Sequence, residues 1–124
     1  MKILTGVDLI YLPRFKNALK NGGENFLRRV FLAKELENQQ LEHLAGIFAA
    51  KEAAIKALSL PPNSWHNIQI THQPDGAPQA KIFNFLASRR SGQFSIFNSS
   101  LSISHDGNYV IAQFVAILDE KSTS

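Results

Sequence analysis

The chain has 124 residues, of which 44% are hydrophobic, and no long low-complexity tract, which is the composition of a single globular domain. No apolar run reaches the roughly 20 residues of a membrane span, and the strand-like start lacks the apolar core of a secretory signal. The absence of cysteine excludes disulfide and thiolate chemistry and fits a cytoplasmic protein. Without an apolar run of membrane-spanning length, no membrane partner is expected.

The net charge of +3 is unevenly distributed along the chain. Residues 1–30 contain six Lys or Arg and two acidic residues, whereas the remaining 94 residues contain seven basic and eight acidic residues. This excess is typical of solvated helix faces, but it also fits a patch that binds an acidic partner or phosphates.

Residues 3–11 are predicted to form a strand, because apolar side chains occupy both of its alternating faces. Asp8 lies in this run on the same face as Leu4 and Ile10. An unpaired buried carboxylate would cost several kcal/mol. A metal ion or a hydrogen-bond network is therefore expected to compensate Asp8.

Helical segments follow this strand. The strongest signal is His43–Ser59, which has apolar residues at three- and four-residue spacing and is stopped by Pro61 and Pro62. Three shorter helices are predicted before it. The first is a basic helix over Arg14–Lys20, which Gly22 and Gly23 end. The others are a short helix over Asn25–Val30 and a surface helix over Ala33–Gln40.

The rest of the chain is predicted to be mainly strands, with turns around Gly76 and Gly107. The expected strands are Ile68–His72, Gln79–Phe83, Ser99–Ser104 and Tyr109–Ile117, with a short helix over Asn84–Arg90. We therefore expect an α+β fold in a single domain, residues 1–118, in which a mainly antiparallel sheet packs on one long central helix. Residues 119–124 are expected to form a flexible tail.

Glu52 and Lys56 are four residues apart, so they lie on one face of the long helix, one turn from each other. Such a pair is usually a surface ion pair worth a few tenths of a kcal/mol. Here the neighbouring residues are mostly alanine, which indicates a buried helix, and a charged pair on a buried helix is more often functional.

His105 ends a predicted strand where a turn begins. A histidine there is usually an ordinary surface residue, but it could bind phosphate or act as an acid or base near neutral pH. The other histidines, His43, His66 and His72, have no metal-ligand spacing and are interpreted as structural.

Three segments together resemble a known family. They are Gly6-Val7-Asp8-Leu9 with Arg14-Phe15, then Phe48-Ala49-Ala50-Lys51-Glu52-Ala53 with Lys56-Ala57-Leu58, then Ser102-Ile103-Ser104-His105 with Tyr109-Val110-Ile111-Ala112. In this order and spacing they resemble holo-acyl-carrier-protein synthase, the small type of 4′-phosphopantetheinyl transferase. The resemblance covers nearly the whole chain and implies the α+β fold of that family.

The resemblance also implies roles for single residues. Asp8 and Glu52 match the magnesium-binding carboxylates of the family, Lys56 matches the lysine that contacts the phosphates of coenzyme A, and His105 matches the histidine near the nucleotide end of the coenzyme. Asp106 follows that histidine in some members and is implied as a weaker coenzyme contact.

The implied activity is the Mg²⁺-dependent transfer of 4′-phosphopantetheine from coenzyme A to a serine of an apo acyl carrier protein. Mg²⁺ would bridge the pyrophosphate and Lys56 would offset charge on the departing 3′,5′-ADP, while Glu52 or a metal-bound water accepts the serine proton. Arg14 matches the basic residue that meets the acidic carrier. The family further implies a homotrimer with sites between subunits, for which Phe-rich strands would supply an apolar interface.

Two departures from the family pattern leave alternatives open. Ile47 stands where the family usually has arginine, and Ser59-Leu60-Pro61-Pro62 replaces a Gly-rich turn. One alternative is therefore a catalytically weak relative that binds coenzyme A or a carrier protein without efficient transfer. Another, suggested by the charge distribution, is a binding module whose basic N-terminal third meets nucleic acid or an anionic surface. The active transferase, with no nucleic-acid partner, is the prediction.

Overall fold

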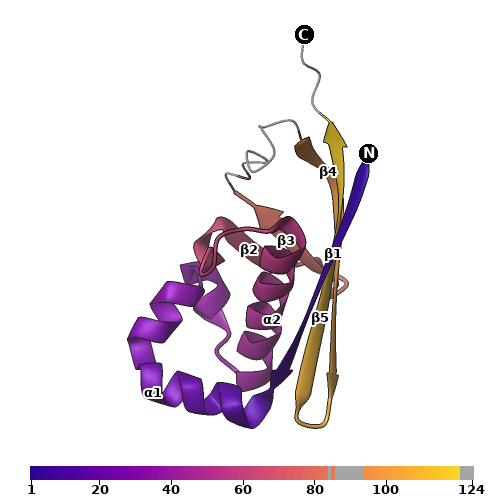
Figure 1. The fold of residues 1–124 in the computed structure, drawn as a ribbon. Helices are drawn as coiled ribbons and strands as arrows, with labels where there is room; N and C mark the ends of the chain where they lie inside the picture. The colour runs from indigo at the N-terminus through magenta and orange to yellow at the C-terminus, as the bar shows by residue number, and fades with distance from the viewer. Residues whose placement is uncertain (84, 86–93, 121–124) are drawn as a thin grey trace.

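The computed structural model describes residues 1–83, 85 and 94–120 (Figure 1). Its elements are, in chain order, β1 (Lys2–Tyr11), α1 (Leu12–Val30), the 3-10 turn η1 (Ala33–Glu37), α2 (Leu41–Leu58), the 3-10 turn η2 (Trp65–Asn67), β2 (Ile68–His72), β3 (Pro78–Ile82), β4 (Phe94–Asp106) and β5 (Tyr109–Glu120). Within these residues no helix is long and apolar enough to cross a membrane.

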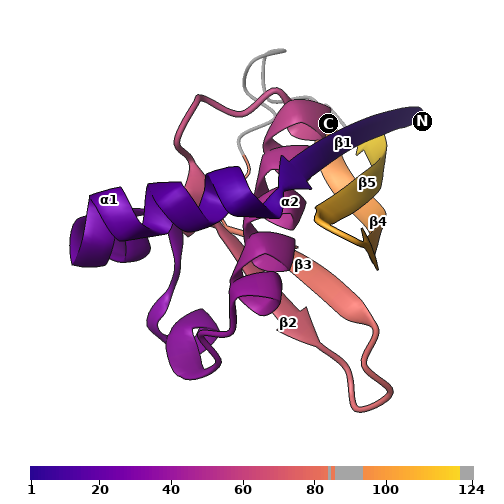
Figure 2. The ribbon, with the colours of Figure 1, turned by 90° about the horizontal axis from the view of Figure 1, so that it is seen from below.

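Two antiparallel sheets flank the central helix α2. The larger sheet has the strand order β1-β5-β4 and the smaller one pairs β2 with β3. The two views of the ribbon show α2 between the larger sheet and α1, with the small sheet beside it (Figures 1 and 2). The predicted α+β fold around one long helix is therefore confirmed.

Gly6 allows β1 and α2 to pack with their backbones in contact. A Cβ atom at this position would fall on the carbonyl oxygen of Ala53 and lie 2.8 Å from the backbone nitrogen of Ala57. Neither backbone atom can move without breaking the helix, so only glycine fits here. This close contact brings the following residues of β1, including Asp8, against the C-terminal half of α2.

The helices predicted over Arg14–Lys20 and Asn25–Val30 are parts of the single element α1. This element is broken at Gly23, whose φ of 54° and ψ of −143° are not helical. The surface helix predicted over Ala33–Gln40 is wrong in length and in burial. The structure has the short 3-10 turn η1, which ends at Glu37 and buries Glu35 at 4% exposure. Sequence spacing favoured a solvated helix because the segment is rich in charged and amide side chains.

The two C-terminal strands are longer than the sequence indicated. β4 begins at Phe94 and bends at a register shift between Ile96 and Asn98, where polar side chains obscure the strand pattern. β5 continues through Glu120, two residues into the segment expected to be a tail. The predicted helix over Asn84–Arg90 lies, apart from Phe85, outside the described residues, as do residues 121–124.

A fully buried lysine connects the helices to the segments that follow them. Lys51, on α2, has 0% exposure, and its Nζ lies 2.6 Å from Glu35 Oε1. The same ammonium donates hydrogen bonds to the carbonyl oxygens of Val30, at 2.7 Å, and Trp65, at 3.1 Å. Burial lowers the pKa of Lys51, and the hydrogen bond and charge of Glu35 oppose this shift.

Glu35 uses both carboxylate oxygens. Oε1 also accepts a hydrogen bond from the backbone N–H of Leu32, and Oε2 accepts one from that of Ile70, both at 2.8 Å. The ion pair therefore links the end of α1, η1, α2, η2 and β2 through a single set of charge-assisted hydrogen bonds.

Replacement of this lysine tests the role of the pair. We expect Lys51→Met to lower the free energy of unfolding by about 3–5 kcal/mol, because it leaves a charged Glu35 in the core. Urea unfolding of the variant measures the loss. The double variant Lys51→Met/Glu35→Gln should recover part of it, and Lys34→Met, at an exposed position, serves as the control. A stability of Lys51→Met equal to that of the control would contradict this role.

Candidate functional site

Asp8 lies on the inner face of β1, as the alternation of its sequence predicted. Its carboxylate retains 14% exposure, and its Oδ1 accepts a hydrogen bond from Lys56 Nζ at 2.7 Å. The ammonium of Lys56 also donates to the carbonyl oxygen of Val7 at 3.1 Å. The side chain of Lys56 is 55% exposed, so its ammonium is accessible from the solvent side as well as paired with Asp8.

The second oxygen of Asp8 has no partner. Oδ2 is buried. Among the described residues, it is the one buried side-chain oxygen or nitrogen without a hydrogen-bond partner. A buried charged oxygen without a partner costs free energy, so its presence indicates a ligand that the protein itself does not supply. A carboxylate oxygen of this kind is a suitable ligand for a hard divalent cation.

Glu52 lies one turn before Lys56 on α2, on the same face of the helix. Its Oε1 accepts a hydrogen bond from Trp65 Nε1 at 3.2 Å. This contact with η2 fixes the orientation of a half-buried carboxylate. Sequence analysis did not identify Trp65 as part of the site, because it is 13 residues from Glu52 and meets it only through folding.

Asp8 and Glu52 could hold a metal ion that takes its other ligands from elsewhere. The described residues contain no cluster of three or more His, Asp or Glu side chains with metal-binding geometry. Two protein carboxylates with substrate phosphates and water complete the shell that Mg²⁺ usually has in phosphate-handling sites. The residues present therefore fit a magnesium ion, on the evidence of the unpartnered oxygen of Asp8.

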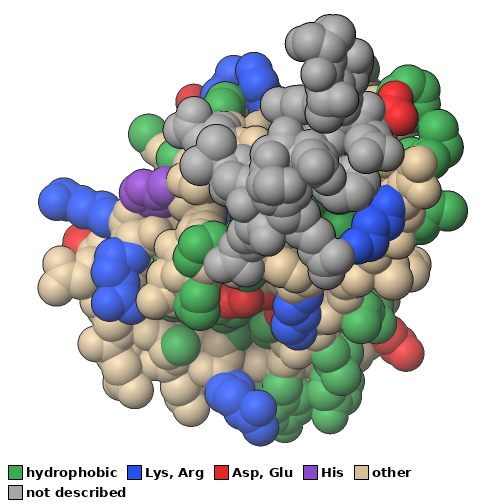
Figure 3. All heavy atoms as spheres, turned by 45° about the horizontal axis from the view of Figure 1, so that its top comes forward, with side chains coloured by type: hydrophobic (Ala, Val, Ile, Leu, Met, Phe, Trp, Pro, Cys, Tyr) green, Lys and Arg blue, Asp and Glu red, His purple; other side chains and the backbone are tan. Residues whose placement is uncertain are grey.

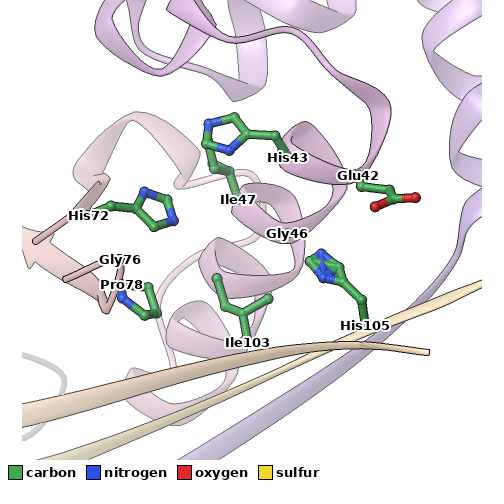
Figure 4. A pocket seen from close by; sticks show the side chains of 9 residues that line it. All are labelled: Glu42, His43, Gly46, Ile47, His72, Gly76, Pro78, Ile103 and His105. Atoms are coloured by element: carbon green, nitrogen blue, oxygen red, sulfur yellow. The ribbon is translucent and has the colours of Figure 1, made fainter. Parts of the chain in front are cut away.

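His105 lies in a separate pocket of about 190 Å³, at the N-terminal part of α2 (Figure 4). Gly46 forms its floor, and a Cβ there would lie 3.8 Å from His105 Nε2. Ile47, which stands where the resemblance expects arginine, also lines the pocket and is 2% exposed. The other lining residues are Glu42, His43, His72, Gly76, Pro78 and Ile103.

Two histidines interpreted as structural belong to this pocket. The ring centroids of His43 and His72 are 5.4 Å apart, on α2 and at the end of β2. Burial lowers the pKa of His43, the nearby His72 lowers it further, and Glu35 opposes these shifts. Sequence spacing gave no signal for this pair, because packing of β2 on α2 brings the two residues together.

Within one chain, the His105 pocket is separated from the site that contains Asp8 and Lys56. Asp8 pairs with Ala112, which in turn pairs with Ile103, whereas His105 pairs with Val110, two residues along β5 from Ala112. Strand spacing places the Cα atoms of Asp8 and His105 roughly 12 Å from each other. The sequence-predicted site residues therefore form two clusters, at the two ends of α2.

The remaining two predicted site residues lie outside both clusters. Asp106 is exposed and, by strand alternation, points to the opposite face of the sheet from His105. Arg14 lies on α1, with its guanidinium 6.0 Å from the centre of the Tyr11 ring. It borders an apolar pocket of about 190 Å³ that also includes Phe15 and Phe48.

The outer face of the large sheet is apolar along β1 and β5. Its exposed residues are Ile3, Val7, Leu9, Tyr11, Tyr109 and Ile111, each at 38% exposure or more. Figure 3 shows hydrophobic side chains along the edge of the view on which Figure 1 places β1, β4 and β5. Among the described residues of β1 and β5, this face is aliphatic and tyrosine-lined, and Phe114 of β5 lies in the core.

Comparison with known proteins identifies the class of this fold and site. A family model described as the 4′-phosphopantetheinyl transferase superfamily matches residues 5–113. A holo-[acyl-carrier-protein] synthase of Dehalococcoides mccartyi strain ATCC BAA-2266 is 41% identical over 117 residues, which are 92% of this chain and 98% of the relative. A synthase of Thermoanaerobacter sp. strain X514 is 36% identical over 131 residues, covering 100% of this chain and 94% of the relative.

The fold agrees with these relatives. A crystal structure of Helicobacter pylori holo-[acyl-carrier-protein] synthase in complex with coenzyme A is 28% identical and has a TM-score of 0.79, covering 92% of this chain and 100% of that one. The chain therefore belongs to the holo-[acyl-carrier-protein] synthase family of 4′-phosphopantetheinyl transferases, as the three sequence segments predicted.

Proposed function

We propose that the chain transfers 4′-phosphopantetheine from coenzyme A to a serine hydroxyl of an apo acyl carrier protein, depends on Mg²⁺ and releases 3′,5′-ADP. Family membership supports the transferase activity. The observation that carries the metal dependence is the buried, unpartnered Oδ2 of Asp8 beside the ammonium of Lys56. A cytoplasmic location is part of this proposal and fits the absence of cysteine.

Asp8 and Glu52 would hold the magnesium ion, with Trp65 keeping the Glu52 carboxylate in place. Bound there, Mg²⁺ would neutralise charge on the pyrophosphate of coenzyme A. Lys56 already has its ammonium at this position and would stabilise the negative charge that develops on the departing 3′,5′-ADP. Each of these residues would act at the pyrophosphate group of coenzyme A.

The acidic carrier would dock on α1. This helix carries Arg14, Lys16, Lys20, Arg28 and Arg29 at exposed positions against one acidic residue, Glu24. Arg14 stands beside the apolar pocket that Phe15 and Phe48 help to form, so it combines a cation with an apolar contact. Such a surface suits an acidic protein partner that also presents apolar side chains.

A homotrimer would cover the apolar outer face of the sheet. Six exposed apolar side chains on β1 and β5 form a patch that a monomer seldom leaves in water. The separation of the Asp8 and His105 clusters within one chain also favours a site completed by a second subunit. Coenzyme A would then contact the Asp8 cluster of one subunit and the His105 pocket of another.

The catalytically weak relative remains a second candidate, supported by the apolar Ile47 in the His105 pocket and by the loop after α2. Ser59 takes a left-handed conformation there, with a φ of 53°, where a glycine would be less strained. The experiment below separates this candidate from the active enzyme.

The transfer reaction tests the proposed function directly. Incubation with Mg²⁺, coenzyme A and an apo carrier should add the mass of phosphopantetheine to the carrier, and a chelator should abolish this gain. Glu52→Gln should lower the rate by on the order of 100-fold or more, whereas Glu37→Gln, at an exposed position, should not. Coenzyme A binding without any mass gain would support the weak relative instead.

Emission of Trp65, the one tryptophan of the chain, reports on the metal without turnover. Because its indole donates to Glu52, Mn²⁺ titration should quench the fluorescence of the wild type. The quenching should be lost in Asp8→Asn. Equal quenching in both proteins would overturn the assignment of Asp8 as a ligand.

Carrier docking predicts a selective effect of Arg14. We expect Arg14→Ala to raise the KM for the carrier about tenfold, equivalent to about 1.4 kcal/mol, and to leave the KM for coenzyme A unchanged. Steady-state kinetics with each substrate varied in turn measures this, with Lys34→Ala as the control. A change in the KM for coenzyme A alone would contradict the docking role.

The trimer predicts a solution mass three times the 13.8 kDa of the chain. Val7→Glu places a charge in the centre of the apolar face, where Val7 is 51% exposed. Light scattering should find this variant monomeric, with wild-type circular dichroism and little transfer activity. Lys34→Glu, on η1, should remain trimeric. A monomeric wild type with full activity would exclude sites between subunits.

A further inference from the structure

The His105 pocket obtains any positive charge from imidazoles. Its described lining contains no lysine or arginine, and Glu42 is its one carboxylate. His43, His72 and His105 are the lining side chains that can become cations. Figure 4 shows the rings of His43 and His72 on one side of the pocket and that of His105 near Gly46. An anion in this pocket would therefore meet a charge that depends on pH.

The position of the pocket favours an anion. His43 lies in the first turn of α2, an 18-residue helix whose N-terminal backbone N–H groups carry partial positive charge. No side chain caps this end of the helix. Gly46 lines the pocket beside Ile103 and His105, and a Cβ there would lie 3.5 Å from Ile103 and 3.8 Å from His105.

Two neighbouring imidazoles cannot both be charged at little cost near neutral pH. With ring centres 5.4 Å apart, protonation of one disfavours protonation of the other. The pKa of His43 is already lowered by burial and by His72, while Glu35, which pairs with Lys51, opposes the shift. Without a ligand, protonation of His43 is therefore disfavoured. An anion placed against both rings would favour their protonation.

We propose that His43 and His72 form a proton-coupled pair that binds the phosphate monoester at the nucleotide end of coenzyme A, so that ligand binding takes up a proton. This inference rests on the proposed function. Coenzyme A carries a pyrophosphate and one phosphate monoester, on the 3′-oxygen. Asp8, Glu52 and Lys56 account for the pyrophosphate, which leaves the monoester for the cationic groups of the second cluster.

The apolar Ile47 strengthens the argument. It lies one turn after His43 on α2 and lines the same pocket, so a permanent cation is missing where the resemblance expects arginine. With no permanent cation among the lining residues, affinity for the monoester depends on imidazole protonation. Coenzyme A affinity thereby becomes sensitive to pH between about 6 and 8, the range in which histidine titrates.

Binding of 3′,5′-ADP measured by calorimetry tests the pair without turnover. The dissociation constant of the wild type should fall on the order of tenfold from pH 8 to pH 6.5. Repeating the titration in buffers of different ionisation enthalpy should show proton uptake. Both phosphate monoesters of 3′,5′-ADP titrate near pH 6, so the result is read as the difference between wild type and variants at each pH.

Three variants separate the pair from its surroundings. His43→Gln and His72→Gln should each weaken binding at pH 6.5 and flatten its pH dependence. His72→Lys, at an exposed position, should restore tight binding that no longer varies with pH. His66→Gln, also exposed and outside this pocket, is the matched control and should behave as wild type.

Dephospho-coenzyme A, which lacks the monoester, should bind with the same affinity to the wild type and to both glutamine variants. Equal proton uptake by the wild type and the two glutamine variants would overturn the proposal. So would substitutions that lower the affinity for dephospho-coenzyme A as much as they lower the affinity for 3′,5′-ADP. Failure of carrier modification with the predicted proton uptake intact would instead overturn the proposed transferase and leave the phosphate-binding pair standing.

Discussion

The buried ion pair of Lys51 and Glu35 is the interaction on which the arrangement of this molecule depends. Its charges are shielded from water, so each must be satisfied within the protein, and the hydrogen bonds that satisfy them come from five different elements. The pair therefore fixes α2 relative to η2 and to the small sheet. These are the same elements that carry Glu52, Trp65, His43 and His72.

A second constraint acts at the opposite side of α2, where Gly6 lets β1 approach the helix backbone. This contact between backbones holds β1 close to the part of α2 that carries Lys56, whose ammonium donates to Asp8. The result is a carboxylate with one oxygen paired and one left for a ligand. The site is thus held on both sides by contacts that tolerate little variation.

In the proposed function, the two clusters of polar residues would bind the two anionic groups of coenzyme A, the pyrophosphate and the phosphate monoester. The Asp8 cluster combines carboxylates with a permanent cation, which suits a metal ion and a pyrophosphate. The His105 pocket has imidazoles and a helix N-terminus, which suit a single phosphate whose binding responds to pH. In the proposed trimer, the apolar outer face of the sheet would form the contact between subunits. This contact would bring the Asp8 cluster of one chain near the His105 pocket of another.

The sequence by itself determined the fold class, the long central helix and the strand face that Asp8 shares with Leu4 and Ile10, because hydrophobic periodicity and residue order encode these locally. Motif spacing likewise indicated Glu52, Lys56 and His105. Only the tertiary structure decided that Glu35 is buried with Lys51 and that Trp65 contacts Glu52. It also decided that His43 and His72 share a pocket. These contacts join residues far apart in the chain, and no local pattern records which charged or aromatic side chains the packing of helix and sheets will bring together.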